Sequence, residues 1–189
     1  PSMPTIAELS QPMLRLAGAR INPRTNGPHL GPRFTGLLLQ RIADGSQRRI
    51  ELPAGAAVGW PNWSPDGRKI AFARTLDDRI ELWVADVATA AARRLTDAPL
   101  NAADGAPCQW LPDSARLLCR FVPDGRGAPP APPAVPAGPV VQETGGAAAP
   151  VRTYQDLLEN AHDEELFDYY FTAQLALVDA ATGARTPVG

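Results

Sequence analysis

Short runs of alternating hydrophobic and polar residues, separated by polar turns, form the main pattern along this chain. The clearest run surrounds residues 64–67, which read Ser-Pro-Asp-Gly. Proline presets φ at the second position of a tight turn, and Asp and Gly suit the two positions after it. Ile70 and Phe72 then alternate with smaller residues, which is the periodicity of a strand. The pattern predicts a β-hairpin here and a third strand at 82–86.

The same unit returns at regular offsets along the chain. Trp63-Ser-Pro-Asp-Gly is followed 47 positions later by Trp110-Leu-Pro-Asp-Ser. The Leu-x-Val at 82–84 is preceded by Leu-x-Leu at 37–39, an offset of 45, and followed by Leu-x-Leu at 175–177, an offset of 93. Repeats of short strands with such a period are typical of β-propeller blades. Any antiparallel meander would show strand-turn-strand periodicity, but these aligned positions favour true repeats.

The expected fold class is therefore all-β: an incomplete β-propeller of about two and a half blades. We expect a strand pair at 36–52, a well-defined blade at 57–96, and another blade that begins with the hairpin at 110–121. Residues 1–35 are expected to be irregular, apart from a helical turn at 6–9, so the chain divides into 1–35 and 36–189. Propellers have at least four blades, so we expect a larger protein to complete this one.

An insertion at about 123–172 interrupts the last blade. Residues 123–150 contain eight prolines, five glycines and no aromatic residue. Proline removes amide donors and fixes φ, so this stretch predicts a long extended loop. Thr153 followed by Asp156 fits the start of one short helix, and the acidic residues 163–165 before an apolar face fit another. We expect one or two short helices that pack on the propeller.

Charge and motifs exclude several classes of function. The 18 Lys and Arg residues nearly balance the 20 Asp and Glu residues, with no basic stripe for nucleic acid. The apolar runs are far too short for a membrane span, and no charged-then-apolar leader follows Pro1. There is no Gly-x-Ser-x-Gly, and His29 and His162 lie far apart. We therefore expect no catalytic residue, metal or cofactor in this chain; self-association remains open.

Cys108 and Cys119 flank the second hairpin. If Trp110 pairs with Leu117, the two cysteines lie opposite each other, which allows either a cross-strand disulfide or two buried thiols. A disulfide would indicate an oxidising compartment. With the Ala- and Pro-rich, bacterial-looking composition, it favours a periplasmic or secreted location, with a cytoplasmic location as the alternative.

Two groups of charged residues are candidates for binding. Arg24 and Arg33 lie in a loop rich in Pro and Gly, which is either a solvated loop or a basic loop that binds an acidic group. Glu164 and Glu165 follow Asp163 in the acidic run, which is either an ordinary first turn of a helix or a site for an amine or for acid-base chemistry.

Some segments resemble a known family. The repeat at 63–72 with Leu-Trp-Val-Ala-Asp at 82–86 resembles the TolB-like propeller repeat. The insertion is more specific: Pro-Val-Val-Gln-Glu at 139–143, Val-Arg-Thr-Tyr-Gln-Asp-Leu-Leu at 151–158 and Asp-Glu-Glu-Leu-Phe-Asp-Tyr-Tyr at 163–170 resemble the prolyl oligopeptidase family. Within it, these segments and the N-terminal residues 4–10 and 16–22 are most similar to the glutamyl endopeptidase branch. The resemblance covers essentially the whole chain.

The resemblance implies a two-part serine peptidase that acts on peptides. An N-terminal propeller would gate and line the substrate cavity, and a C-terminal α/β-hydrolase domain would carry the Ser-Asp-His triad, outside this chain. Cleavage after Glu would need a cation, for which Arg24, Arg33 and Arg152 are candidates by chemistry. Glu164-Glu165 is similar to the pair that holds the substrate's amino terminus in the dipeptidyl peptidase IV branch. The alternative is a non-catalytic TolB-like scaffold that binds a protein or peptide.

Overall fold

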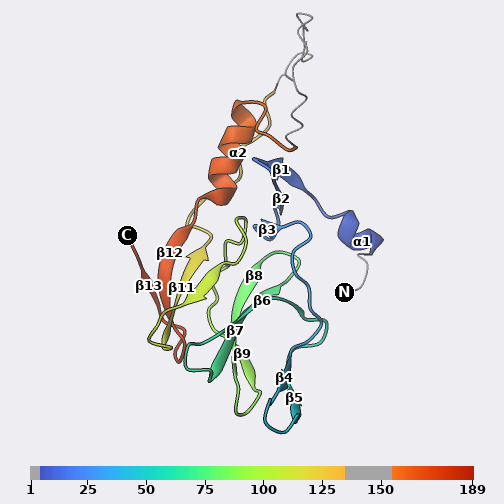
Figure 1. The fold of residues 1–189 in the computed structure, drawn as a ribbon. Helices are drawn as coiled ribbons and strands as arrows, with labels where there is room; N and C mark the ends of the chain where they lie inside the picture. The colour runs from blue at the N-terminus through green and yellow to red at the C-terminus, as the bar shows by residue number, and fades with distance from the viewer. Residues whose placement is uncertain (1–4, 135–154) are drawn as a thin grey trace, which may run out of the picture.

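The computed structural model describes residues 5–134 and 155–189, and these residues form mainly antiparallel sheets (Figure 1). An N-terminal helical turn, α1 (Ile6–Leu9), precedes a small sheet of β1 (Leu14–Leu16), β2 (Ala19–Asn22) and β3 (Gly27–Pro28). The remaining strands are β4 (Leu38–Gln40), β5 (Gln47–Arg49), β6 (Ala57–Trp63), β7 (Lys69–Thr75), β8 (Ile80–Asp86), β9 (Ala92–Arg94), β10 (Cys108–Trp110), β11 (Arg116–Phe121), β12 (Gln174–Asp179) and β13 (Arg185–Pro187).

Two complete blades and half of another make up the propeller part. Strands β6 to β9 and strands β10 to β13 each form a four-stranded antiparallel meander, whereas β4 and β5 form a pair. The insertion lies between β11 and β12, as expected, and contains helix α2 (Ala161–Phe171). The prediction of an incomplete β-propeller of about two and a half blades is confirmed. In the described part of the chain, no helix is long and apolar enough to cross a membrane.

The Ser-Pro-Asp-Gly turn between β6 and β7 forms as its sequence predicts. The Gly67 amide donates to the Ser64 carbonyl at 2.8 Å, and Gly67 has a φ of 69°. The Ser64 hydroxyl donates to Asp66 at 2.6 Å and accepts from the Lys69 amide at 2.9 Å. Since only glycine adopts this φ without steric cost, Gly67 is the residue that the turn requires.

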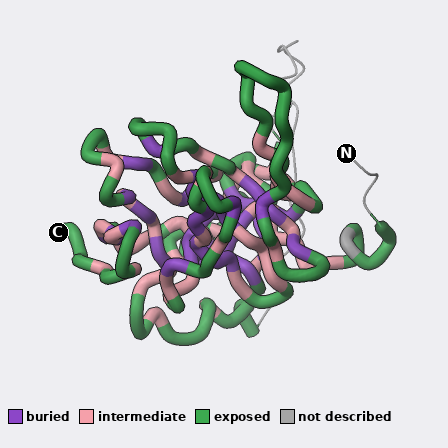
Figure 2. Tube along the Cα trace, turned by 90° about the horizontal axis from the view of Figure 1, so that it is seen from below, coloured by how far each residue is buried: buried purple, intermediate pink, exposed green. Residues whose placement is uncertain are grey.

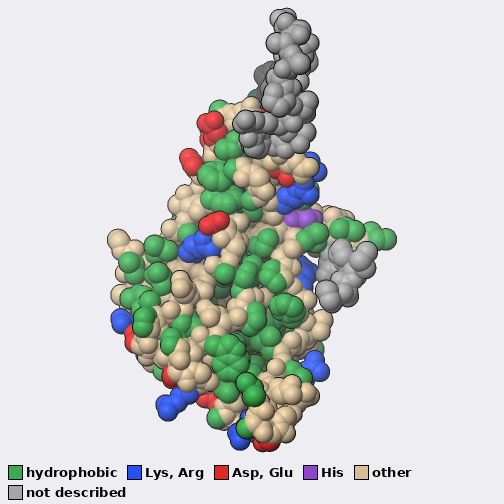
Figure 3. Space-filling view, viewed as in Figure 1, with side chains coloured by type: hydrophobic (Ala, Val, Ile, Leu, Met, Phe, Trp, Pro, Cys, Tyr) green, Lys and Arg blue, Asp and Glu red, His purple; other side chains and the backbone are tan. Residues whose placement is uncertain are grey.

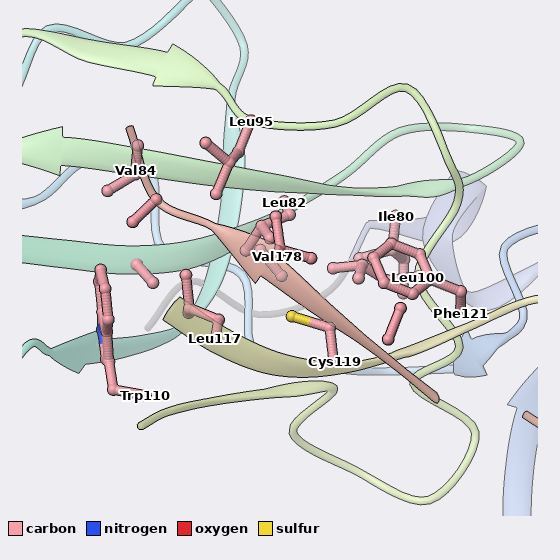
Figure 4. Packing of buried hydrophobic residues seen from close by; sticks show 14 of the residues in the cluster. Ile80, Leu82, Val84, Leu95, Leu100, Trp110, Leu117, Cys119, Phe121 and Val178 are labelled. Carbon is pink, nitrogen blue, oxygen red and sulfur yellow. The ribbon is translucent and has the colours of Figure 1, made fainter. Parts of the chain in front are cut away.

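The core lies between the two complete blades. Leu82 and Val84 on one sheet face Leu117, Phe121 and Val178 on the other, and Figure 4 shows them pointing toward one another. Ala71 and Ala73 belong to the same cluster. All of these side chains are buried, and Figure 2 shows the buried residues gathered in the middle of the molecule. Burying one large apolar side chain contributes roughly 1.5–3 kcal/mol, so this contact sets how neighbouring blades stack. The opposite face of the first complete blade buries Ile70 and Phe72 against Ile50 of the half blade.

The N-terminal region differs from its prediction. Within the first 35 residues, expected to be irregular, β1 and β2 form a hairpin closed by Ala17 and Gly18, which have φ of 50° and 83°. Leu16 and Ile21 are buried between this hairpin and α2. Strands this short give a weak sequence pattern, and the helix that covers them lies far away in the sequence, so local periodicity did not reveal them.

The insertion contains one helix in the described residues. The expected helix starting near Thr153 does not extend into 155–160, because Asp156 has a φ of 58° there and the backbone is not helical. Thr153 itself lies outside the described residues. The helix α2 packs mainly on β1 of the N-terminal sheet, and it contacts the propeller part through Asn101 and Ala103, which lie between the two complete blades.

A buried carboxylate on β8 gathers three arginines. The Glu81 side chain is buried, with the guanidinium groups of Arg79, Arg94 and Arg74 at 3.1, 3.4 and 3.7 Å. The Trp83 indole also donates to it at 2.9 Å. Burial by itself raises the pKa of Glu81, but the hydrogen bonds from Trp83, Arg79 and Arg94 outweigh burial and hold that pKa below its ordinary value. The carboxylate therefore stabilises the blade in its charged form.

Glu81→Gln should destabilise β7 and β8 at neutral pH, because three cations lose their common anion. We expect a loss of about 1–3 kcal/mol, reduced because Arg79 and Arg94 are partly exposed. Hydrogen exchange of the β7 and β8 amides in the intact protein measures this loss of stability. Since the folded pKa lies below the ordinary 4.5, the contribution is complete above that pH and is lost as the pH falls through the folded pKa.

The exposed Asp78 also pairs with Arg79 and provides the matched control, Asp78→Asn, which should change the exchange little. Equal exchange rates in wild type and Glu81→Gln at neutral pH, or a difference that persists in acid, would contradict this account.

The cysteines lie where the expected register places them. Trp110 pairs with Leu117, and Cys108 lies opposite Cys119 across β10 and β11, where the structure joins their sulfurs as a disulfide. Cys119 is fully buried in the core between the blades and Cys108 is half-buried. The register thus allows the bond, and its presence in solution remains a prediction.

The intact protein, denatured without reductant, should have a mass about 2 Da below its all-thiol value, because forming one disulfide removes two hydrogens. Peptide mapping should recover Cys108 and Cys119 in one linked pair. Rapid alkylation of both thiols in unreduced, unfolded protein would rule the bond out.

Candidate functional site

Helix α2 forms one end of the molecule, beyond the N-terminal sheet and opposite the β4–β5 hairpin (Figure 1). Its start is fixed locally: the Asn160 side chain accepts from the Asp163 amide at 3.0 Å, and the Asp163 carboxylate accepts from the Glu159 amide at 2.9 Å. Asp163 and Glu164 lie in the first turn, where negative charge is favoured by the helix dipole. Figure 3 shows acidic side chains on the surface around this helix.

One face of α2 packs against the N-terminal hairpin. Leu166 and Tyr170 are buried against Leu16 and Ile21. The rings of Phe167 and Phe171, one turn apart, stack with their centroids 4.3 Å apart. Burial also raises the pKa of Tyr170. The apolar face predicted from i, i+4 spacing therefore exists, and its partner is the hairpin.

Two buried asparagines hold the C-terminal end of α2. The Asn26 side-chain amide donates to the Tyr170 carbonyl at 3.1 Å. The Asn101 side-chain amide donates to the same carbonyl at 3.0 Å and to the Thr172 carbonyl at 2.9 Å. These carbonyls would otherwise lack partners at a helix end. The helix is thereby tied both to the β2–β3 turn and to the segment that leads into β10.

Arg126 completes this attachment. Its guanidinium donates to the Asn26 side-chain oxygen at 2.6 Å and to the Tyr169 carbonyl at 3.1 Å, and it lies 4.1 Å from the centre of the Tyr169 ring. A cation is favoured at the negative end of a helix and over an aromatic face. The Tyr169 hydroxyl donates to the Gly127 carbonyl at 2.8 Å. The first residues of the insertion are therefore fixed on the end of α2.

The other side of the insertion is tied to the same hairpin. The Asp156 carboxylate accepts from Arg20 Nε at 2.8 Å and lies 3.7 Å from Arg15 Nε. Its carbonyl accepts from the Gly18 amide at 2.8 Å. Arg15, Arg20 and Asp156, with Glu159 and Asp163, line an open hollow of about 560 Å³. The charges there are mixed, and Asp156 already neutralises its arginines.

The candidate residues from the sequence fall into two separate groups. Glu164 and Glu165 are exposed near the start of α2, with a Glu165 carboxylate oxygen 4.0 Å from His162 Nδ1. Arg24 is exposed in the β2–β3 turn, and Arg33 is exposed after β3. Arg152 lies outside the described residues. Residues 5–134 and 155–189 contain no group of three or more His, Cys, Asp or Glu placed to hold a metal ion.

Four residues with these contacts were not predicted from the sequence: Asn26, Asn101, Arg126 and Glu81. Two of them have weak signals in the sequence. Asn26 belongs to an Asn-Gly dipeptide, which favours a turn, and Arg126 lies in a loop rich in Pro and Gly. Asn26, Asn101 and Arg126 anchor the end of α2, whereas Glu81 lies on β8. These residues do not include a nucleophile paired with a base, so they can position the helix but cannot by themselves break a bond.

Comparison with known proteins gives relatives over the whole chain. No protein-family model matches it. It is 36% identical over 204 residues, covering all of this chain, to a probable chloroplastic glutamyl endopeptidase of Oryza sativa subsp. japonica, and 36% identical over 93% of the chain to one of Arabidopsis thaliana. The chain spans 21% and 20% of their lengths. A solved β-propeller domain, of the Trilobed protease from Pyrococcus furiosus, gives a TM-score of 0.43 at 17% identity, covering 81% of this chain and 34% of that one.

The predicted periplasmic or secreted bacterial location is wrong, because both of these relatives are described as chloroplastic plant proteins. The prediction relied on a cysteine pair and on Ala- and Pro-rich composition. A cysteine pair indicates redox chemistry but not a compartment. Amino-acid composition indicates neither an organelle nor export, so neither feature determines where the protein is located.

The resemblance proposed from the sequence is confirmed. The similarity extends over the whole chain, so it includes the insertion with α2 as well as the blade repeats. A blade can form without the insertion, so the need to form blades does not account for the similarity there. Over its whole length this chain therefore resembles the glutamyl endopeptidases of the two plants, and it corresponds to about a fifth of their length.

Proposed function

We propose that this chain is the propeller part of a serine peptidase whose catalytic triad lies in an α/β-hydrolase domain outside these 189 residues. The observation that carries the proposal is the 36% identity to a glutamyl endopeptidase over the whole chain, insertion included. The hydrolase domain would cleave peptide bonds through an acyl-enzyme. The propeller would contribute no reacting group and would act by limiting and orienting what enters the cavity.

The fixed position of α2 supports a role at the substrate cavity. A helix held by Asn26, Asn101 and Arg126 presents its first residues in one orientation, so Glu164 and Glu165 stand at a defined place on the surface. Side chains on anchored elements orient a ligand better than side chains on free loops, because less ordering is needed on binding. We propose that this end of the propeller faces the hydrolase domain and that the two carboxylates contact the amino-terminal side of a peptide.

A preference for Glu in the substrate requires a cation. Arg24 suits this role because its exposed side chain lies in a turn whose backbone is fixed: the Arg24 amide donates to the Asn22 side chain at 3.0 Å. Arg33 and Arg152 are the other candidates by chemistry. Arg15 and Arg20 are less suitable because they already face Asp156.

The full-length protein should react with a fluorophosphonate probe, and the label should map to a serine outside residues 1–189. The physical reason is that only a serine activated by a neighbouring base attacks the probe at neutral pH. Heat-denatured protein is the control and should not be labelled. If native protein stays unlabelled and does not cleave peptides, the peptidase proposal fails, and the non-catalytic scaffold that binds a protein or peptide takes its place.

In the full-length enzyme, Arg24→Gln should lower kcat/KM for a Glu-containing peptide about tenfold while leaving the Gln-containing peptide nearly unchanged. A hydrogen bond between charged groups contributes about 1.5–3 kcal/mol, and 1.4 kcal/mol is a factor of ten. Arg41→Gln, an exposed arginine near the β4–β5 turn at the opposite end, is the matched control.

An equal loss for both peptides would show that Arg24 does not read the Glu side chain, and Arg33→Gln and Arg152→Gln would then be measured in the same assay. Comparing peptides with free and acetylated amino termini in Glu164→Gln and Glu165→Gln tests the proposed amine contact. If acetylation matters equally in the variants and the wild type, that contact is absent.

A further inference from the structure

Residues 101–107, which lead into β10, form the platform on which the C-terminal end of α2 rests. The Asn101 side chain donates to the Tyr170 carbonyl, as described above. The Ala102 main-chain amide donates to the Asn26 carbonyl at 2.9 Å. The alanine that follows is buried in the apolar cluster between α2 and the N-terminal hairpin. The position of the helix therefore depends on the shape of this segment.

Arg120 on β11 closes this segment at both ends. Its main-chain carbonyl accepts from the Asn101 main-chain amide, and its own amide donates to the Pro107 carbonyl, each at 2.9 Å. Its guanidinium donates to the Asp104 carboxylate at 2.9 Å and to the Asp104 carbonyl at 2.9 Å. The same guanidinium donates to the Ala106 carbonyl at 2.8 Å. One residue of the blade thus binds the start, the middle and the end of the platform.

The contacts in the middle of the platform require an arginine at this position. Residues 101–107 form no helix or strand, and Gly105 has a φ of 84°, so no regular hydrogen-bond ladder serves the carbonyls of this loop. A guanidinium can donate to several acceptors at once because its N–H groups are held in a fixed plane. The Arg120 side chain is 27% exposed and that of Asp104 is 79% exposed, so solvent weakens their ion pair. The two carbonyl contacts therefore matter most for the shape of the loop.

A change at the held end of α2 reaches its other end. The helix has 11 residues, which is about 15 Å at 1.5 Å per residue, and it is continuous. A tilt at the C-terminal end therefore displaces Glu164 and Glu165 near the start. Of the other two residues that hold the helix, Asn26 is itself bound by the Ala102 amide of the platform, so only Arg126 acts independently of it.

We propose that Arg120 is a positioning residue for peptide recognition. It fixes the shape of residues 101–107, the platform fixes the end of α2, and the helix fixes the placement of Glu164 and Glu165. Arg120 itself contacts neither the peptide nor a reacting atom. The effect on peptides rests on the proposed function, whereas the coupling of Arg120 to α2 depends only on the contacts described here.

Hydrogen exchange in the full-length protein tests the coupling without any measurement of activity. Arg120→Gln should speed the exchange of the main-chain amides of residues 170–172 about tenfold, because the end of α2 opens more often once its platform is loose. The amides of β7 and β8 should exchange as in the wild type, since neither strand contacts the platform through Arg120.

Two further variants keep this test specific. Arg116→Gln is the matched control, because Arg116 lies on the same strand and its side chain donates to Asp113 in its own turn. It should leave the exchange of α2 unchanged. Asp104→Ala removes only an exposed partner of Arg120 and should speed exchange at the end of α2 to a smaller extent. It keeps the test valid if Arg120→Gln does not fold.

The effect on recognition is measured with peptides that have free or acetylated amino termini. In the full-length enzyme, Arg120→Gln should raise KM for the free peptide about tenfold with kcat nearly unchanged, because displaced carboxylates lose binding to the amine while the catalytic groups stay in place. The acetylated peptide should be unaffected. Arg120→Lys should restore part of the loss, since lysine keeps the charge but not the fixed fork of donors. When Glu164→Gln and Glu165→Gln are already present, adding Arg120→Gln should change KM no further.

The positioning role is overturned if Arg120→Gln and Asp104→Ala leave the exchange of α2 unchanged, or if Arg116→Gln speeds it equally. It is also overturned if exchange in β7 and β8 rises as much as in α2, or if kcat falls equally for both peptides, because either result indicates a general loss of folded protein. A wild-type enzyme that is indifferent to acetylation would remove the amine contact from the proposed function, and hydrogen exchange would still decide the role of Arg120.

Discussion

Stacking of one blade sheet on the next is the constraint on which the rest of this structure depends. A four-stranded blade has two apolar faces and cannot bury either face alone. The β6–β9 blade meets this requirement on both sides: Leu82 and Val84 pack against the β10–β13 blade, and Ile70 and Phe72 pack against the half blade. Where a neighbour is incomplete, as beside Trp63, apolar surface stays exposed. The exposed Trp63 is therefore apolar surface that the stacking of these blades leaves uncovered.

Polar contacts fix the insertion, in contrast to the apolar contacts that fix the blades. Asn26, Asn101 and Arg126 bind the carbonyls at the end of α2, while Asp156 ties the segment before α2 to Arg20. Buried polar groups are costly unless they are paired, so such a network tolerates few alternative arrangements. The helix is consequently held in one position on the N-terminal sheet. This matters for a propeller that would select peptides, because recognition by a fixed side chain costs less ordering than recognition by a loose one.

The local sequence was sufficient to predict structure wherever the stabilising contacts join residues that are close together in the chain. The turn at residues 64–67, the offsets of the blades and the pairing of Trp110 with Leu117 could all be predicted, because hairpin register follows from turn length and alternation. The N-terminal sheet could not be predicted, since its stability depends on Leu166 and Tyr170 of a helix far along the chain. No helix covers 155–160 for a similar reason: Asp156 takes a left-handed backbone conformation, and its carboxylate binds Arg20.

The sequence by itself thus determined that this protein is built from propeller blades, that an insertion interrupts the last one, and that the chain resembles a peptidase family. Those conclusions rest on periodicity, turn chemistry and composition, which are properties of neighbouring residues. Only the tertiary structure decided which charges are buried together around Glu81, how α2 is anchored through Arg126, and which repeated tryptophan is left uncovered. These outcomes depend on contacts between residues distant in sequence, and no local pattern encodes which distant partner a side chain will meet.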